Sequence, residues 1–428
     1  MRMFRTAGLA ASLMSGICLA MPAAAQEQAA APSYELSRDV RQAAQQAQLA
    51  IAQNNFAAAS AALNQAGAAV QNDGDRYVIA TMQLDVANRT FNQAAQVAAI
   101  DALIASPMVS ESERAELYYH RGRIAYNSGD NNAAQSSLQT AVQRGSTNPR
   151  TYVALASLLQ QARDNAGALA AVDQAFQLQQ TAAVPIPEDW YRRAIDIAQR
   201  VGDQGKVAQW YYALLAAYPT VRNWRDALRH YRTTMAADPE AVFDLWRLQA
   251  ATETLTGEGD YLAFAQAANS AEHPGEATRA IEAGRGNSML DGRNAEIAAL
   301  ARTTGQAASS LRGRLESRAT AARSAATGAE AMAVADAYLD FGQFAEAAEF
   351  YRLAVEKGGI DAQRANLRLG IALSQAGDVA TARTTLNGVT GPLGGVARYW
   401  TVFANTRPAQ APVMTPAAVS TSDNATGG

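Results

Sequence analysis

The sequence offers few side chains that could ligate a metal ion or act as a general base. Its three histidines, His120, His230 and His273, are widely separated in the chain. None belongs to a His-x-x-x-His or His-x-x-Glu-His arrangement, which would place two ligands on one face of a helix. We therefore expect no metal site, and we interpret His120 as a partly buried structural side chain rather than as a catalytic base.

Motifs for phosphate binding and nucleophilic catalysis are also missing. The glycine-containing segment Gly284–Asn287 lacks the Lys-Ser/Thr end of a phosphate-binding loop and follows no strand pattern. The sequence has no Gly-x-Ser-x-Gly motif. A lytic transglycosylase would carry a catalytic glutamate followed by a Gly-Leu-Met-Gln type of stretch, and this combination is absent from the sequence. We expect no cofactor and no catalytic residue. A helical polysaccharide-cleaving enzyme is the alternative, which the scarcity of histidines disfavours.

One aromatic section could instead bind a partner. Four of the five tryptophans lie between residues 190 and 246, together with several tyrosines and with more basic than acidic side chains. Aromatic rings beside guanidinium groups suit an extended peptide or a glycan. The candidate partner-binding residues are Trp190, Trp210, Tyr211, Trp224, Arg225, Tyr231 and Trp246. The alternative is that these rings fill the core, because Trp224, Leu228 and Tyr231 have helical spacing.

A second basic group follows further along the chain. It consists of Arg302, Arg312, Arg314, Arg318 and Arg323, with Glu316 as the acidic residue among them. We interpret this group as the solvated face of a helix. Contact with an anionic polymer or with the acidic patch of a partner is the alternative.

These side chains must be positioned by helices, because small residues recur at a fixed spacing. A small residue is followed twelve positions later by alanine and sixteen positions later by a larger apolar residue, usually with another small residue after nineteen. The residues expected to pack one helix against the next are Gly122, Ala134, Leu138, Ala141, Ala156, Ala168, Val172, Ala175, Ala335, Ala347, Tyr351, Ala354, Gly370, Ala382 and Leu386. Turns are predicted about five residues before the alanine that opens the packing face of a second helix, at Asn54-Asn55, Gly129-Asp130, Gly342-Gln343 and Gly377-Asp378.

This spacing resembles the tetratricopeptide repeat, in which small residues let the first helix of a pair lie close to the second. The resemblance is strongest over residues 116–178 and 331–390, although Tyr118 and Tyr152 stand where the family has a tryptophan. It implies an all-α fold, a right-handed superhelical solenoid of antiparallel helix pairs. The composition agrees, because only 7% of the residues are aromatic and a core of alanine and leucine favours closely spaced helices.

Prolines, glycines and composition divide the chain. Pro185 and Pro187 interrupt helix and mark a joint after the first array. We expect a signal peptide over 1–25, a flexible lead-in over 26–33, an N-terminal array over 34–180, degenerate helical repeats over 181–330, C-terminal repeats with a capping helix over 331–405, and a disordered tail over 406–428. The tail has almost no large apolar residues and so cannot offset the entropy of ordering.

The N-terminus is typical of a secretory signal peptide. Arg2 and Arg5 precede an uncharged run that ends at Ala25, and its apolar centre is short for a membrane span. We expect cleavage between Ala25 and Gln26, which also removes the single cysteine, Cys18. No later stretch is long and charge-free enough to cross a bilayer, and we therefore expect an exported bacterial protein in the periplasm.

Charge and repeats together favour a binding role. The formal net charge of −3 gives no global reason to bind nucleic acid. We expect a non-catalytic periplasmic scaffold or adaptor that binds a protein or peptide partner in the cell envelope. The alternative is a structural accessory of envelope assembly or polysaccharide export that also contacts a glycan.

Overall fold

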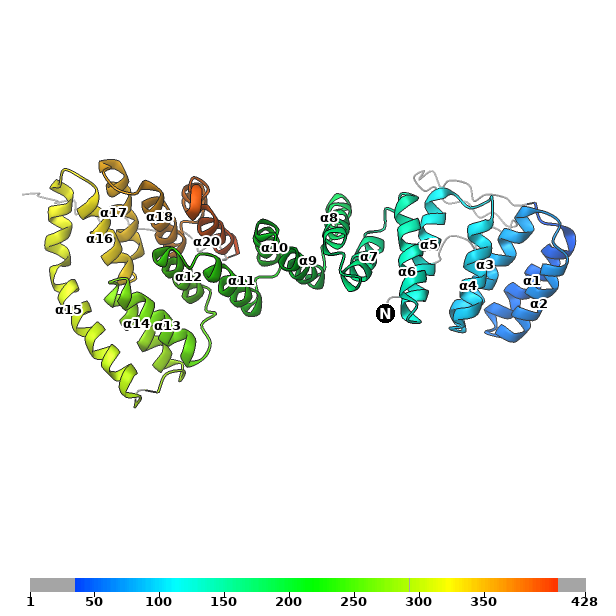
Figure 1. The fold of residues 1–428 in the computed structure, drawn as a ribbon, viewed down its shortest axis with the longest axis horizontal. Coiled ribbons are helices and arrows are strands. Elements are labelled where there is room, and N and C mark those ends of the chain that lie inside the picture. Colours follow the sequence, from blue (N-terminus) through cyan, green and yellow to red (C-terminus); the bar gives the residue numbers. More distant parts are fainter. Residues whose placement is uncertain (1–34, 292, 407–428) are drawn as a thin grey trace, which may run out of the picture. The chain divides into compact units, whose positions relative to one another are not determined.

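The computed structural model describes residues 35–291 and 293–406. The expected signal peptide with its cleavage between Ala25 and Gln26, the lead-in and the tail from residue 407 lie outside the described residues. Within the described ranges the chain forms twenty α-helices, one 3₁₀ turn and no strand (Figure 1). No helix there is both long and apolar enough to span a membrane. The predicted all-α solenoid of helix pairs is confirmed.

The chain divides into two compact units between Pro185 and Ile186, inside the proline-containing joint. In the first unit, consecutive helices pack in pairs. Its helices are α1 (Arg38–Ala52), α2 (Phe56–Ala68), α3 (Asp73–Arg89), α4 (Gln93–Ala105), α5 (Glu111–Asn127), α6 (Asn131–Gln143), α7 (Pro149–Gln161) and α8 (Asn165–Thr181).

The second unit contains both the middle section and the C-terminal repeats. Its first helices are α9 (Glu188–Val201), α10 (Gln204–Ala217), α11 (Val221–Thr234), α12 (Pro239–Ala251), α13 (Gly257–Ser270) and α14 (Pro274–Gly286). The long helix α15 (Ala295–Ser324) connects them to α16 (Ala329–Asp340), α17 (Phe344–Lys357), α18 (Ala362–Ala376), α19 (Val379–Asn387), η1 (Gly391–Leu393) and α20 (Gly394–Thr406).

A short turn with the same design joins the two helices of each pair in the first unit. One turn residue has a positive φ, and the next residue caps the second helix by accepting a backbone N–H with its side chain. The positive-φ residues are Asn54, Phe91, Gly129 and Arg163. The capping residues that follow them are Asn55, Asn92, Asp130 and Asp164.

The core of each pair lies in the seam between its helices. All fifteen residues expected to pack the helices together are buried. A Cβ added to Gly122 would lie 2.8 Å from Cγ of Leu138, and Gly370 has the same relation to Leu386. The small residue therefore sets the close approach of the helices, and the larger residue fills the space beside it.

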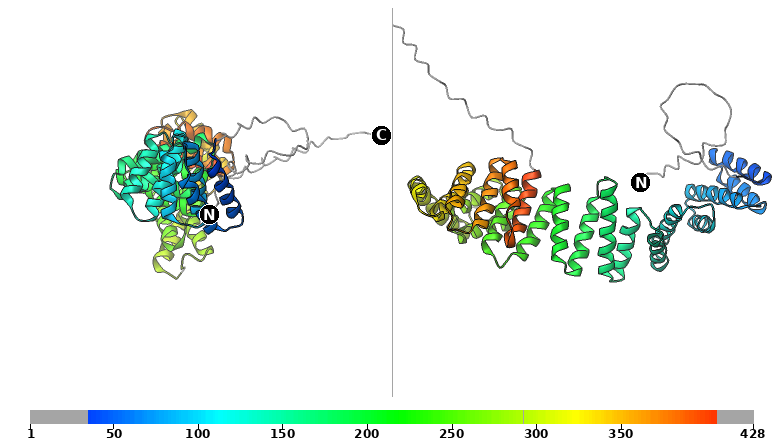
Figure 2. Two further views of the ribbon diagram at one scale, coloured as in Figure 1. Left: turned by 90° about the vertical axis from the view of Figure 1, so that its right-hand side faces the viewer. Right: turned by 90° about the horizontal axis from the view of Figure 1, so that it is seen from above.

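The second unit closes on itself. Helix α20 contacts α10 and α12, and α16 contacts α14. Figures 1 and 2 show the yellow-to-red helices α16 to α20 beside the green helices of the same unit. The Tyr212 hydroxyl donates to the Gly395 carbonyl at 3.0 Å, and the Trp400 indole donates to the Asp244 carbonyl at 3.2 Å. The C-terminal repeats therefore complete the unit that begins with α9.

Candidate functional site

The aromatic section lies on α9 to α12, and its residues fall into two groups. The buried group, at most 8% exposed, consists of Trp190, Trp210, Tyr211 and Trp224. The half-buried group consists of Arg225, Tyr231 and Trp246. The four buried side chains fill the core of the second unit, as the packing alternative predicts, and they present little surface to a partner.

Tyr231 takes part in docking the last helix. The ring of Tyr399 is fully buried and lies 4.9 Å from the ring of Tyr231 and 4.5 Å from that of Tyr212. Gly395 lies directly against the Tyr231 hydroxyl, where a Cβ would overlap it. Close backbone approach at this glycine lets α20 pack on α10 and α11.

Four arginines lie on one side of α11, and two of them are the exposed part of the aromatic section. We call Arg222, Arg225, Arg229 and Arg232 the α11 arginine face. Their spacing of three, four and three residues places them on one side of a helix. The opposite side buries Trp224, Ala227 and Leu228. The side chains of Arg222 and Arg229 are 77% and 72% exposed.

Nearby carboxylates neutralise the α11 arginine face only in part. Asp226 lies 2.7 Å from Arg229 and 3.9 Å from Arg222. Asp260 lies 3.3 Å from Arg225. The Arg232 guanidinium stacks 3.7 Å from the ring centroid of Trp246, and burial, with the charges of Arg229 and Arg225, lowers its pKa to about 10. Four guanidinium groups thus face two carboxylates, which leaves a positive surface.

A small hollow borders this face. It has a volume of about 120 Å³ and lies among helices α9, α10 and α11. Asp226 lines it together with Arg192, Asp196 and Tyr211. The hollow could receive one side chain of a partner, but it is too small for a drug-sized ligand, whose pockets span about 300–1,000 Å³.

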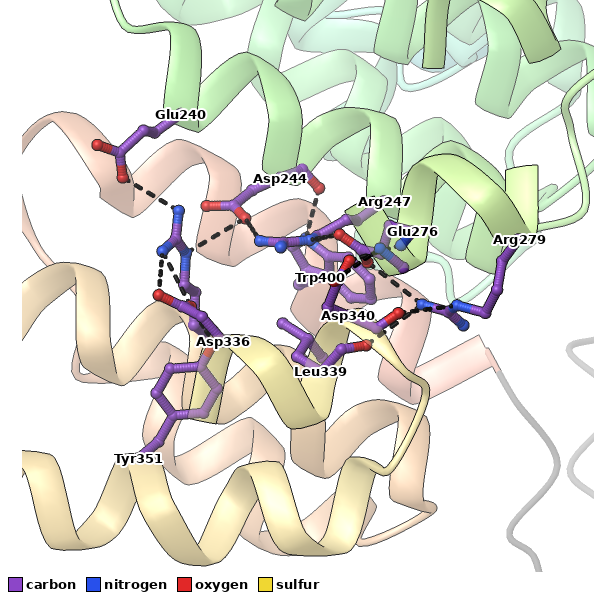
Figure 3. Close-up of polar contacts among 12 residues, drawn as sticks. Glu240, Asp244, Arg247, Glu276, Arg279, Asp336, Leu339, Asp340, Tyr351 and Trp400 are labelled. Carbon is purple, nitrogen blue, oxygen red and sulfur yellow. Dashed lines mark hydrogen bonds and ion pairs between the residues drawn. The ribbon is translucent and has the colours of Figure 1, made fainter. Parts of the chain in front are cut away.

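A second group of charged residues is buried where the two halves of the second unit meet (Figure 3). Arg247 is 2% exposed and donates to Asp244 at 2.6 Å and to Glu276 at 2.8 Å. Burial opposes its charge, but Glu276 and Asp244 outweigh that effect and raise its pKa. Such a pair is stable only while both partners remain, because an isolated buried charge is costly.

Arg368 on α18 extends this group. It donates to Asp336 and to Glu240, at 3.0 Å in each case, and Asp336 also accepts the Tyr351 hydroxyl at 2.5 Å. Glu240 belongs to α12, 128 residues before Arg368. The buried charge network, as we call it, joins α12 and α14 to α16 and α18, and the exposed Glu240 lies at its edge. It consists of Glu240, Asp244, Arg247, Glu276, Asp336, Asp340 and Arg368.

Asp340 caps a helix from another part of the chain. Its carboxylate accepts the N–H of Gly275 at 2.8 Å and that of Glu276 at 2.5 Å, at the start of α14. In the opposite direction, the Arg279 side chain of α14 donates to the carbonyls of Asp340 and Leu339 at the end of α16. Burial and the nearby charge of Glu276 raise the pKa of Asp340 to about 7. Figure 3 shows these groups converging between α14 and α16.

Sequence reasoning did not find the buried charge network. The local signals are ordinary, because Asp244 and Arg247 are three residues apart and Glu276 and Arg279 repeat that spacing. Such pairs are common on solvated helices. Their burial follows from contact between helices far apart in the sequence, which the repeat pattern does not specify.

The three histidines have different environments. His120 is largely buried in α5, where burial and Arg123 lower its pKa to about 4. His230 stacks on Tyr211 at 5.5 Å. His273 lies in the turn before α14, close to Glu276 and Asp340. The structure therefore brings one histidine to two carboxylates that sequence spacing did not connect to it.

The second basic group lies on α15, and other residues engage part of it. Arg318 lies 2.9 Å from Glu330, and Arg323 lies 3.0 Å from Glu349. Arg312 stacks over Phe341 at 4.4 Å. Arg302 and Arg314 are exposed. The arrangement agrees better with a solvated helix face than with a concentrated anion site.

Comparison with known proteins identifies one repeat directly. Residues 115–144 match the family model described as tetratricopeptide repeat. No curated protein sequence matches the chain. The crystal structure of MamA protein aligns at 13% identity and a TM-score of 0.32, covering 41% of this chain and 90% of that one. A tetratricopeptide repeat protein from Parabacteroides merdae aligns at 11% identity and a TM-score of 0.35, covering 63% and 99%.

The matched segment comprises nearly all of α5 and α6, together with the Gly129-Asp130 turn between them. The same design, a small residue facing a larger apolar residue across the seam, recurs between α18 and α19 in the second unit. The chain therefore contains a tetratricopeptide repeat at residues 115–144, and helix pairs of the same design recur elsewhere in it.

Proposed function

We propose that the protein is a non-catalytic scaffold that holds a protein partner in the cell envelope of a bacterium. Tetratricopeptide arrays expose an extended surface along stacked helices, and such surfaces bind peptides and proteins. The N-terminal sequence, with Arg2 and Arg5 before an uncharged run, supports export to the periplasm. Fractionation of cells should place the processed chain with periplasmic markers, and retention in the cytoplasm would contradict this location.

The α11 arginine face is the observation that carries the binding role. Arg222 and Arg229 extend into solvent, while Arg225 and Arg232 are held by Asp260 and Trp246. Charged groups held in place in this way lose little side-chain freedom on binding. Their surplus positive charge fits an acidic segment of the partner, because complementary charge favours both encounter and register.

The experiment uses a photo-crosslinking residue at position 221 in intact cells, because Val221 is 51% exposed at the start of α11. We expect it to trap one envelope protein, since this position adjoins Arg222. The double substitution Arg222→Glu and Arg229→Glu should abolish that product. Arg302→Glu with Arg314→Glu on α15 makes the same change in net charge and should leave it unaffected. Equal loss in both double variants would refute a specific role for α11.

A glycan contact is the second candidate, which Phe91 favours. Its ring is 78% exposed in the turn between α3 and α4, where the flanking residues are polar. Phenylalanine is usually buried in the protein core, so an exposed ring is informative. Such a ring can stack on the apolar face of a sugar. Binding of purified envelope polysaccharide that is lost in Phe91→Ala would support it, and binding that is equal in both proteins would not.

A further inference from the structure

Three side chains with metal-ligating atoms meet where α14 approaches α16. They are His273 in the turn before α14, Glu276 in its first turn, and Asp340 at the end of α16. Their ligand atoms lie within 4.8 Å of one another. The three residues are 8%, 5% and 0% exposed. One imidazole and two carboxylates are therefore gathered in a nearly closed space.

His273 differs from the residues at the same place in other turns. Asn55, Asn92, Asp130 and Asp164 each cap the following helix with their side chain. The His273 side chain makes no cap bond to α14, because Asp340 takes over that role from α16. Its ring instead stacks on Phe243 at 4.9 Å, and within the described residues its nitrogens form no hydrogen bond.

Several charged side chains surround this histidine. Asp244, Glu276 and Asp340 are buried carboxylates, and the guanidinium groups beside them are those of Arg247, the half-exposed Arg279 and Arg368, which lies 3.7 Å from Asp244. Burial, with the nearby Arg247 and Arg368, lowers the pKa of His273 well below its usual value, so the imidazole is neutral. A neutral imidazole is the form that ligates metals.

We propose that His273, Glu276 and Asp340 bind one divalent transition-metal ion of the Zn²⁺ class. Nitrogen and carboxylate ligands suit Zn²⁺, which accepts three protein ligands and a water molecule. Ligand atoms around tetrahedral Zn²⁺ are about 3.4 Å apart, so side-chain movements of about 1 Å complete the site. The ion would tie α14 to α16 and thereby hold the closed second unit together.

The surrounding hydrogen bonds are compatible with this role. Each carboxylate oxygen has two lone pairs, so Asp340 can accept the two backbone N–H groups and still ligate an ion. Those N–H bonds fix its orientation, as outer-shell partners do in metal sites. Glu276 likewise retains a lone pair beside its bond from Arg247. Arg247 is shared between Asp244, 2.6 Å away, and Glu276, 2.8 Å away, so part of its charge is neutralised outside the proposed ligand set.

The test is a titration of the purified, chelator-treated full chain with Zn²⁺ by calorimetry. The wild type should bind one ion per chain, and His273→Ala should raise the dissociation constant for Zn²⁺ at least 100-fold. His230→Ala, the matched histidine control, should bind like the wild type. Absence of stoichiometric binding in the wild type, or equal binding by His273→Ala, would overturn the proposal.

A measurement on the wild type keeps the proposal testable if His273→Ala does not fold. X-ray absorption of the Zn²⁺-loaded protein should show one imidazole nitrogen with carboxylate oxygens. A shell of water oxygens alone, or one with two or more imidazoles, would contradict the site. Zn²⁺ should also raise the unfolding midpoint of the second unit, followed by tryptophan fluorescence, while leaving that of the first unit unchanged.

Discussion

Both units are built from helix pairs of the same design, but they differ in the side chains that are buried between the pairs. In the described part of the first unit, Asp75 is the buried charged side chain. The second unit buries Asp244, Arg247, Glu276, Asp340 and Arg368. The first unit is therefore held mainly by alanine and leucine in its seams, whereas the second combines such seams with a buried charge network.

The difference follows from topology. In the first unit the pairs contact their neighbours along the chain, as in other solenoids. In the second unit, hydrogen bonds join residues 128, 156 and 183 positions apart. Surfaces that remain solvated in an open array are buried there, together with their charges. When a solenoid closes on itself, charged side chains on the surface of its repeats become buried. Each buried charge then depends on its ion-pair partner, and removing that partner is strongly destabilising.

The strongest test of this comparison is Arg247→Met. The substitution removes the guanidinium group closest to the buried Asp244 and Glu276 and leaves only the longer contacts of 3.7 and 3.5 Å to other arginines. It should cost the second unit about 3–5 kcal/mol. All five tryptophans belong to the second unit, so urea unfolding followed by tryptophan fluorescence reports on it. Far-UV circular dichroism follows both units.

The matched control in the first unit is Arg121→Met. Arg121 lies 2.6 Å from Asp101, but the two side chains are 33% and 46% exposed. Loss of such a pair should cost about 0–1 kcal/mol. Equal destabilisation by both substitutions would mean that burial of the network does not distinguish the units.

Gly395→Ala tests the closure of the second unit at its last helix. The added Cβ overlaps the Tyr231 hydroxyl and lies 3.3 Å from that of Tyr212, so both rings must shift against Tyr399. Overpacking of this kind should cost about 1–3 kcal/mol in the fluorescence transition. Gly313→Ala in α15 meets nothing within 4 Å and should stabilise by up to about 1 kcal/mol. A neutral Gly395→Ala would argue against tight docking of α20.

Acid should weaken the first unit through His120. Its pKa is lowered to about 4, chiefly by burial, so folding favours the neutral ring. The stabilising contribution is complete above the unfolded pKa near 6.5 and is lost as the pH falls towards 4. Allowing for partial exposure, the loss should be about 1–2 kcal/mol. His120→Gln should flatten this part of the pH profile in urea unfolding followed by circular dichroism, and an unchanged profile would exclude His120 as its source.

Local features of the fold were predictable because they are encoded locally. Gly129-Asp130 specifies a positive φ and a helix cap within two residues, and Gly122 with Leu138 specifies the seam. Helix α15 was less predictable. The region to residue 330 suggested degenerate repeats, yet one helix of 30 residues runs through Gly305 and Gly313. Each glycine costs about 1 kcal/mol in a helix, and packing of the two ends on α14 and α16 can offset that.

The candidate site was only partly predictable. The spacing of Trp224, Leu228 and Tyr231 identified a helix face, but it did not determine whether neighbouring helices cover that face. The structure covers Trp224 and leaves Arg222 and Arg229 exposed on the other side of α11. The proximity of His273 and Asp340 could not be predicted from sequence spacing, because it depends on how α16 packs against α14 after the intervening α15.

The smallest expected effect concerns Phe91, the aromatic residue among the positive-φ turn residues of the first unit. Phe91 has a φ of 53° and an exposed ring, while the same turn position holds Gly129 in the next pair. A bulky side chain there costs about 1 kcal/mol, and no burial of the ring offsets the cost. Phe91→Gly should therefore stabilise the first unit by up to about 1 kcal/mol in urea unfolding followed by circular dichroism. Gly129→Phe should destabilise it by a similar amount. If Phe91→Gly stabilises the first unit and also abolishes glycan binding, the ring contributes to ligand contact and not to stability. Destabilisation by Phe91→Gly would instead mean that the ring contributes to packing in the first unit.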